Sequence, residues 1–145
     1  MEPLSILALV EACGSLSLTL GKVIVVLRDL ASAYKQVAMS IRSLTNECKT
    51  IAVAVERLQD WIESQADATA IDSKIWNQLR ESLDYGELVV NALEEELRPM
   101  SDTRAANGFR RKTKAMWALR TLKIHEDRVR GQVGGLTLLL QIVNL

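Results

Sequence analysis

Apolar residues recur along three segments of the chain at alternating intervals of four and three positions. The first stripe consists of Val37, Ile41, Leu44, Cys48, Ile51, Val55, Leu58 and Ile62. The second consists of Trp76, Leu79, Leu83, Gly86, Val90, Leu93 and Leu97, and the third of Val129, Val133, Leu136, Leu140 and Val143. This spacing returns one side chain per turn to the same face of an α-helix. Each segment therefore predicts a helix that packs against other helices.

A fourth helix is predicted at the start of the chain. Proline is favoured in the first turn of a helix, so we expect this helix to begin at Pro3 or Leu4 and to run to about Leu30. No glycine or proline separates it from the next stripe. One helix over both would be about 90 Å long at 1.5 Å per residue, which a small domain cannot hold. We therefore predict a break at 31–33, with Ser32 as the N-cap of the second helix.

The predicted helices cover about 4–30, 34–63, 73–98 and 119–145, with no strand. Asp72 or Ser73 is the expected N-cap of the third helix, and Pro99 should end it. A linker follows to Gly108, and a short extra helix near 110–117 is expected before the last one. Similar helix lengths favour an all-α, antiparallel four-helix bundle. Glycine destabilises a helix interior, so the glycines of the last helix are expected to allow close approach of a neighbour; they are Gly131, Gly134 and Gly135.

The composition is that of one soluble, globular domain over residues 1–145. The chain has 48% apolar residues, 25% charged residues, and 18 basic against 18 acidic residues, which argues against disorder and against general nucleic-acid binding. Cys13 and Cys48 fall on apolar stripes and are interpreted as buried thiols of a reducing compartment. A chain that folds back near Ser32 would place them at similar heights on facing helices, which keeps a disulfide sterically open.

The first helix is also a candidate for membrane insertion. Leu4 to Gly21 carries one charge, Glu11, and the acidic start of the chain lacks the basic region of a signal peptide. A mid-helix glutamate argues against a permanent span, which leaves a core helix, or a core helix that also enters a bilayer. The candidate inserting residues are Leu4, Ile6, Leu7, Leu9, Val10, Glu11, Leu16 and Leu20.

Charge is unevenly distributed along the second half of the chain. Residues 81–102 hold seven acids and one base, whereas residues 104–130 hold nine bases and two acids. One interpretation is that the last two helices are antiparallel neighbours whose opposite charges pair on solvated faces. The other is a basic patch for anionic lipid or an acidic partner. That patch would consist of Arg110, Arg111, Lys112 and Lys114.

Residues suited to catalysis are scarce. The one histidine, His125, lies on the stripe of the last helix, and no nucleophile or acid recurs around it at a recognisable spacing. No paired metal-ligand spacing and no phosphate-binding glycine loop is present. We therefore expect no enzyme activity, no cofactor, no metal and no small-molecule substrate.

Several short stretches carry a family resemblance. They are Met1–Val10, Tyr34-Lys-Gln, Ser40-Ile-Arg-Ser-Leu44, Cys48, Trp61, Lys112–Trp117 and Arg130–Gln141. In these stretches the chain resembles the HeLo-like N-terminal domain of fungal STAND-type receptors with NACHT or ankyrin-repeat regions. That family is similar to the HeLo domain of fungal incompatibility proteins and, more remotely, to the helical bundle of necroptosis-executing pseudokinases. The resemblance implies a bundle at the signalling end of a larger receptor, which in some relatives inserts its first helix into membranes. It implies no catalytic residue.

Two functions follow as hypotheses. The first is a cell-death or immune-signalling effector that oligomerises and exposes its first helix to the plasma membrane. The second is an interaction module that assembles a receptor without touching lipid. In both, the domain is expected to be the N-terminal part of a longer cytoplasmic protein. Expected partners are further copies of the chain, other receptor domains and, for the effector, an anionic membrane.

Overall fold

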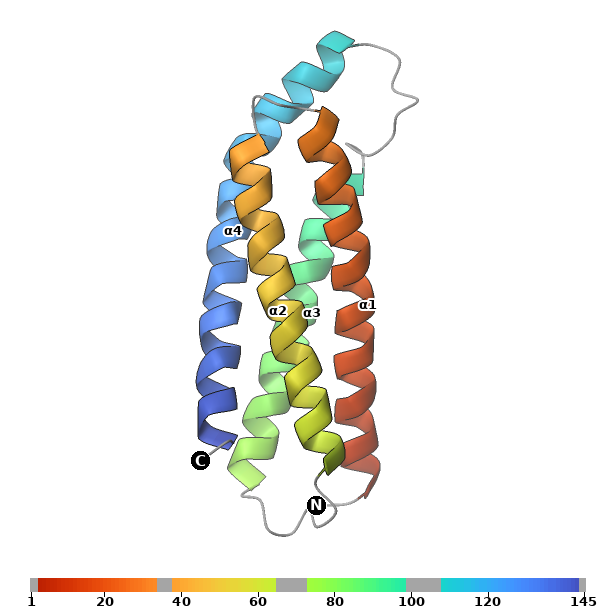
Figure 1. The fold of residues 1–145 in the computed structure, drawn as a ribbon, viewed down its shortest axis with the longest axis vertical. Helices are drawn as coiled ribbons and strands as arrows, with labels where there is room; N and C mark the ends of the chain where they lie inside the picture. The colour runs from red at the N-terminus through yellow and green to blue at the C-terminus, as the bar shows by residue number, and fades with distance from the viewer. Residues whose placement is uncertain (1–2, 34–37, 65–72, 99–107, 144–145) are drawn as a thin grey trace.

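The computed structural model is a bundle of four helices (Figure 1). It describes residues 3–33, 38–64, 73–98 and 108–143, with side chains for 6–32, 39–64, 73–98 and 123–142. The helices are α1 (Pro3–Ala33), α2 (Ala38–Ser64), α3 (Ser73–Leu97) and α4 (Gly108–Val143). No strand occurs within these ranges. The all-helical prediction is confirmed for the described chain.

Two predicted helix boundaries are wrong. α1 continues to Ala33, so Ser32 lies inside α1 and does not cap α2, although the two stripes do belong to separate helices. The expected short helix near 110–117 is the start of α4, which runs unbroken from Gly108. The physical reason is that no proline or glycine interrupts the chain between Gly108 and Gly131. The predicted cap at Asp72 and the linker after Pro99 lie outside the described residues.

Contacts across the bundle give the order and direction of the helices. α1 and α4 each pack against both α2 and α3. Ser43 of α2 donates a hydrogen bond to Glu126 of α4, and Glu47 of α2 pairs with Arg130 of α4. Both partners advance by four residues, so α2 and α4 run in the same direction.

The α3–α4 contacts show the opposite relation. Gln132 of α4 bonds the backbone of Ser82, whereas the earlier residue His125 shares a surface hollow with the later residue Glu96. These two helices therefore run antiparallel. The bundle mixes parallel and antiparallel neighbours, and the predicted simple antiparallel bundle is not confirmed.

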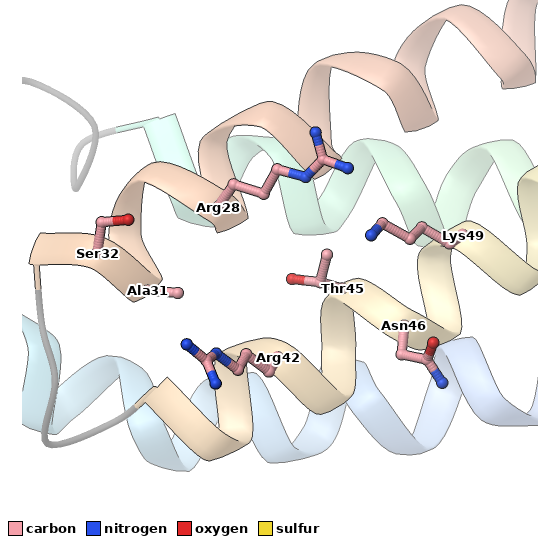
Figure 2. A pocket seen from close by; sticks show the side chains of 7 residues that line it. All are labelled: Arg28, Ala31, Ser32, Arg42, Thr45, Asn46 and Lys49. Atoms are coloured by element: carbon pink, nitrogen blue, oxygen red, sulfur yellow. The ribbon is translucent and has the colours of Figure 1, made fainter.

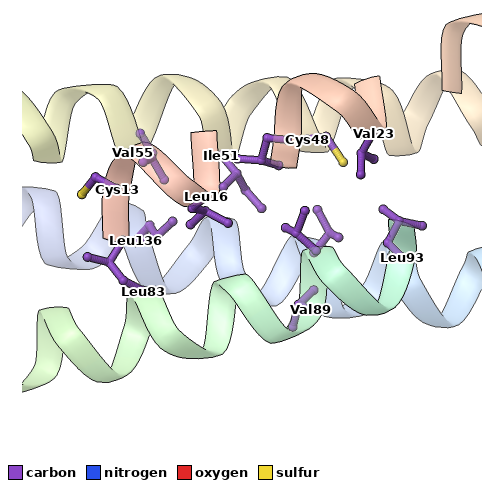
Figure 3. Packing of buried hydrophobic residues seen from close by; sticks show 14 of the residues in the cluster. Cys13, Leu16, Val23, Cys48, Ile51, Val55, Leu83, Val89, Leu93 and Leu136 are labelled. Carbon is purple, nitrogen blue, oxygen red and sulfur yellow. The ribbon is translucent and has the colours of Figure 1, made fainter. Parts of the chain in front are cut away.

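The stripes of α2 and α3 form the core as predicted (Figure 3). Every described member of both stripes is buried, while Val37 lies outside the described residues. α4 is rotated from its expected orientation, because Val133 and Leu140 are only half-buried. Among its described side chains, the buried ones are His125, Val129, Gln132, Leu136 and Leu139. The stripe therefore predicted the burial of His125 but not that of Gln132.

Cys13 and Cys48 are buried free thiols, and they are not at similar heights. Arg28 of α1 and Thr45 of α2 line one pocket, which places Cys48 opposite about residue 25 of α1. At 1.5 Å per residue this is about 18 Å along α1 from Cys13. The separation arises because α1 ends later than the predicted break. Burial raises the pKa of Cys13 to about 11 and that of Cys48 to about 12, so both thiols stay protonated and unreactive.

One close helix contact occurs at Gly86 of α3. A Cβ atom added there would lie 2.8 Å from Gln132 Nε2 and 3.3 Å from Leu16 Cδ2. Gln132 Nε2 donates a 2.7 Å hydrogen bond to the Ser82 carbonyl, so its amide is held against the Gly86 backbone. By contrast, added Cβ atoms at the three α4 glycines would meet nothing within 4 Å, and the close approach predicted for them is wrong.

We expect Gly86→Ala to destabilise the bundle although alanine favours helices. The new methyl group would displace the Gln132 amide and leave a buried polar group without its bond, at a cost of about 1–3 kcal/mol. The matched change Gly134→Ala meets open space and should stabilise by up to about 1 kcal/mol. Urea denaturation of both variants tests this pair. Equal stabilisation by both would contradict the packing of Gln132 against Gly86.

Candidate functional site

The outward side of α1 is apolar. Six of its exposed residues repeat at intervals of four and three and form what we call the α1 outer face: Leu7, Glu11, Gly14, Leu18, Gly21 and Val25. Ser15 and Lys22 are exposed beside this stripe, and Arg28 and Asp29 follow it along the helix. Leu7, Leu18 and Val25 are 55%, 65% and 56% exposed. Within residues 7–25 the exposed positions of α1 carry two charged side chains, Glu11 and Lys22, whereas the exposed positions of α2 carry four within residues 42–57. α1 therefore presents apolar surface on both its sides.

Among the described residues, one helix is long and apolar enough to cross a membrane. It covers Ile6–Ser32, within α1. The core helix of a soluble protein passes the same test, so length and composition do not decide between the two. The two cases differ in how many of the apolar side chains of α1 are already buried in the core of the bundle.

The predicted inserting residues divide between the core and the surface. Leu9, Leu16 and Leu20 are buried, while Leu7 and Glu11 are exposed. Ile6 and Val10 are half-buried, and the side chain of Leu4 lies outside the described residues. Burial of a large aliphatic side chain contributes about 1.5–3 kcal/mol, so α1 can enter a bilayer only if the core opens. Two exposed members of the α1 outer face, Leu18 and Val25, were not among the predicted residues.

A basic pocket lies between the C-terminal half of α1 and the N-terminal half of α2 (Figure 2). Its volume is about 660 Å³, and its lining residues are Arg28, Ala31, Ser32, Arg42, Thr45, Asn46 and Lys49. No carboxylate lines it. The pocket was not predicted, because finding it requires the register of α1 against α2. The available signal was that Arg42, Asn46 and Lys49 recur on one face of a helix.

None of the described ion pairs joins α3 to α4, but most of the bases of residues 104–130 have side chains outside the described ones, so the predicted pairing stays a prediction. Arg130 pairs with Glu47 of α2 and with Glu126 on its own helix, and Arg98, directly after α3, pairs with Glu94 of α3. Arg130 is 58% exposed, and such surface pairs stabilise little.

The predicted basic patch lies in the first turns of α4. Its side chains, from Arg110 to Lys114, are outside the described ones. Figure 1 shows these turns at the end of the bundle where α1 ends and α2 begins. The basic pocket lies at this same end, so two groups of basic residues belong to one end of the molecule.

His125 is buried, with 3% exposure, and its Nδ1 has no hydrogen-bond partner within the described part of the chain. Burial lowers its pKa, the nearby Glu96 opposes that shift, and Arg128 adds to it. A surface hollow of about 500 Å³ borders His125, and its other side chains include Glu95 and Ile124. No group of three potential metal ligands occurs among the described residues. The imidazole therefore belongs to the core as a neutral group.

We expect the stability of the bundle to fall as the pH drops below about 6.5. Because the folded pKa of His125 is lowered, the unfolded chain binds its proton more readily, and the free energy of unfolding decreases as the pH falls toward the folded pKa. His125→Gln should flatten this dependence between pH 7 and 5.5. Urea midpoints across that range measure the effect. An unchanged slope in the variant would show that other groups cause it.

Comparison of the chain with protein-family models, curated proteins and solved structures finds no match. The function therefore has to be inferred from the surfaces described above and from the sequence resemblance.

Proposed function

We propose that this chain is a signalling domain of HeLo-like type, from a fungal STAND-type immune or cell-death receptor, that acts by self-association and by release of α1 to a membrane. The observation that carries the proposal is the α1 outer face, which exposes Leu7, Leu18 and Val25, with Glu11 and Lys22 as the charges nearest to them. Apolar surface of this kind commonly marks an interaction site. The sequence resemblance supports the receptor context.

A second exposed stripe, on α4, suits the α1 outer face of another copy. It consists of Ile124, Arg128, Gly131, Gly135, Leu138 and Ile142, and we call it the α4 flank. The two stripes have the same spacing. Placed parallel, with Leu7 opposite Ile124, they bring Glu11 opposite Arg128 and Leu18 opposite Gly135. Opposite charges and large-on-small packing support this pairing.

The geometry of such a contact favours chains of subunits. α1 and α4 pack on α2 and α3 from different sides of the bundle, so each copy can offer one stripe to each of two neighbours. A head-to-tail contact of this kind gives a closed ring or an open filament. In this proposal, assembly concentrates many α1 helices at one cytoplasmic membrane surface, where anionic lipid is attracted to the basic end of the bundle.

The alternative is a scaffold that self-associates without touching lipid. The burial of Leu9, Leu16 and Leu20 favours it, because the folded bundle holds α1 by its core side chains. In the scaffold the α1 outer face is buried in contacts between copies, and no α1 helix leaves the bundle.

Charge exchange across the proposed contact tests self-association. Glu11→Arg and Arg128→Glu should each weaken assembly in analytical ultracentrifugation, and the double variant should restore it, because the opposite charges are exchanged. Two equal losses without restoration would contradict this contact.

Dye release from phosphatidylserine vesicles separates the two functions. The effector predicts release that rises with assembly of the wild-type domain. Assembly without release would reject the effector and leave the scaffold.

A further inference from the structure

We infer that the pocket between α1 and α2 binds a small anion that carries two or more phosphate groups. Three cationic side chains from two helices border it: Arg28 from α1, and Arg42 and Lys49 from α2. None of the three forms a hydrogen bond or an ion pair with the described residues. Ligand binding at this pocket requires neither self-association nor membrane entry.

All three cations border the same pocket, and two of them approach each other. Figure 2 shows Arg28 and Lys49 reaching from facing helices into the region beside Thr45, with Arg42 farther toward the end of α1. The nearest acidic residue on this part of α2, Glu47, is turned to the other side of the helix, where it pairs with Arg130 at 3.2 Å. Like charges gathered without a counter-charge repel one another. An anion in the pocket removes that repulsion.

The spacing of the cations favours a ligand with several phosphates. Arg42 and Lys49 are seven residues apart on one helix face, which corresponds to about 10 Å along α2. A single phosphate is too small to contact both ends, whereas two or three linked phosphates can. The guanidinium groups of Arg28 and Arg42 can each bind two phosphate oxygens, and the Lys49 ammonium acts as a point charge.

Neutral groups complete the pocket. Ser32 and Asn46 can donate hydrogen bonds to phosphate oxygens. The Thr45 hydroxyl already donates a 2.7 Å bond to the Ile41 carbonyl, so it offers no proton to a ligand. The volume of about 660 Å³ lies within the range of small-ligand sites.

A bound polyphosphate would link α1 to α2. Arg28 lies on one helix and Arg42 and Lys49 on the other, so a ligand that contacts all three holds the two helices together. A ligand that binds only the folded state raises the unfolding temperature of the protein, and the rise increases with ligand concentration. We therefore expect the ligand to stabilise the packed position of α1.

The test is a calorimetric titration of the purified domain with tripolyphosphate at constant ionic strength. Arg28→Gln, Arg42→Gln and Lys49→Gln should each weaken binding by about tenfold, the loss expected for one charge-assisted contact. Arg57→Gln removes an exposed charge of α2 outside the pocket and should leave binding unchanged. Circular dichroism verifies that each variant folds.

Vesicle flotation identifies the source of the phosphate. Vesicles that contain a phosphatidylinositol bisphosphate are compared with vesicles that contain phosphatidylserine at equal charge. Pocket variants that lose both tripolyphosphate and phosphoinositide vesicles indicate a lipid headgroup, and variants that lose only tripolyphosphate indicate a soluble ligand. No binding of tripolyphosphate by the wild type, or equal weakening by Arg57→Gln, would overturn the inference.

Discussion

Replacing Leu44 or Leu83 with alanine should lower the free energy of unfolding by about 2–5 kcal/mol. Leu44 is 0% exposed and Leu83 is 1% exposed, and both lie within the core between the four helices. Truncation removes buried methyl groups and leaves a cavity that rigid helices fill only in part. The measurement is the midpoint of urea unfolding, followed by circular dichroism.

The matched control is Glu95→Ala, at an exposed position on the acidic stretch of α3. A surface change of this kind should alter stability by less than about 0.5 kcal/mol. If all three variants shift the midpoint equally, the core stripes have been assigned to the wrong faces.

The second large effect is expected at the α1 outer face. Leu7→Lys should strongly reduce dye release from phosphatidylserine vesicles, because it adds a second charge to the apolar segment one turn from Glu11, and charges within a membrane helix disfavour insertion. Leu7 is 55% exposed, so the folded bundle accommodates lysine without loss of core packing. The assay compares release by the wild type and the variant at equal vesicle binding.

Thr50→Lys adds the same charge at an exposed position of α2 and serves as the control. It should release dye as the wild type does. If Leu7→Lys also releases dye normally, the α1 outer face is not the inserting surface.

The apolar periodicity predicted the cores of α2 and α3 because every stripe position there is apolar and faces inward. It failed on α4, where Gln132 finds a backbone partner at Ser82 and replaces Val133 as a core residue. Hydrogen bonding of this kind leaves no periodic signal. The end of α1 was also misplaced, because Ser32 is compatible with both a helix interior and a cap.

Sequence patterns predicted the candidate functional surfaces less completely than they predicted the core. Leu18 and Val25 were not predicted, because they are apolar residues on the exposed side of α1 and hydrophobicity alone does not mark a surface position. The basic pocket depends on Arg28 and Lys49, which are 21 positions apart and meet only through the register of two helices. Contacts between helices, and not local spacing, determine both features.

The most direct test of the central claim is a fluorescent probe on the α1 outer face. Leu18→Cys supplies an exposed thiol for an environment-sensitive dye, while Cys13 and Cys48 stay unlabelled because burial keeps them protonated. Glu56→Cys, on the exposed side of α2, is the matched control. On adding phosphatidylserine vesicles to the already assembled domain, we predict a blue shift at position 18 relative to the same assembly without vesicles, and none at position 56. No shift at position 18, or equal shifts at both positions, would contradict the release of α1 to the membrane.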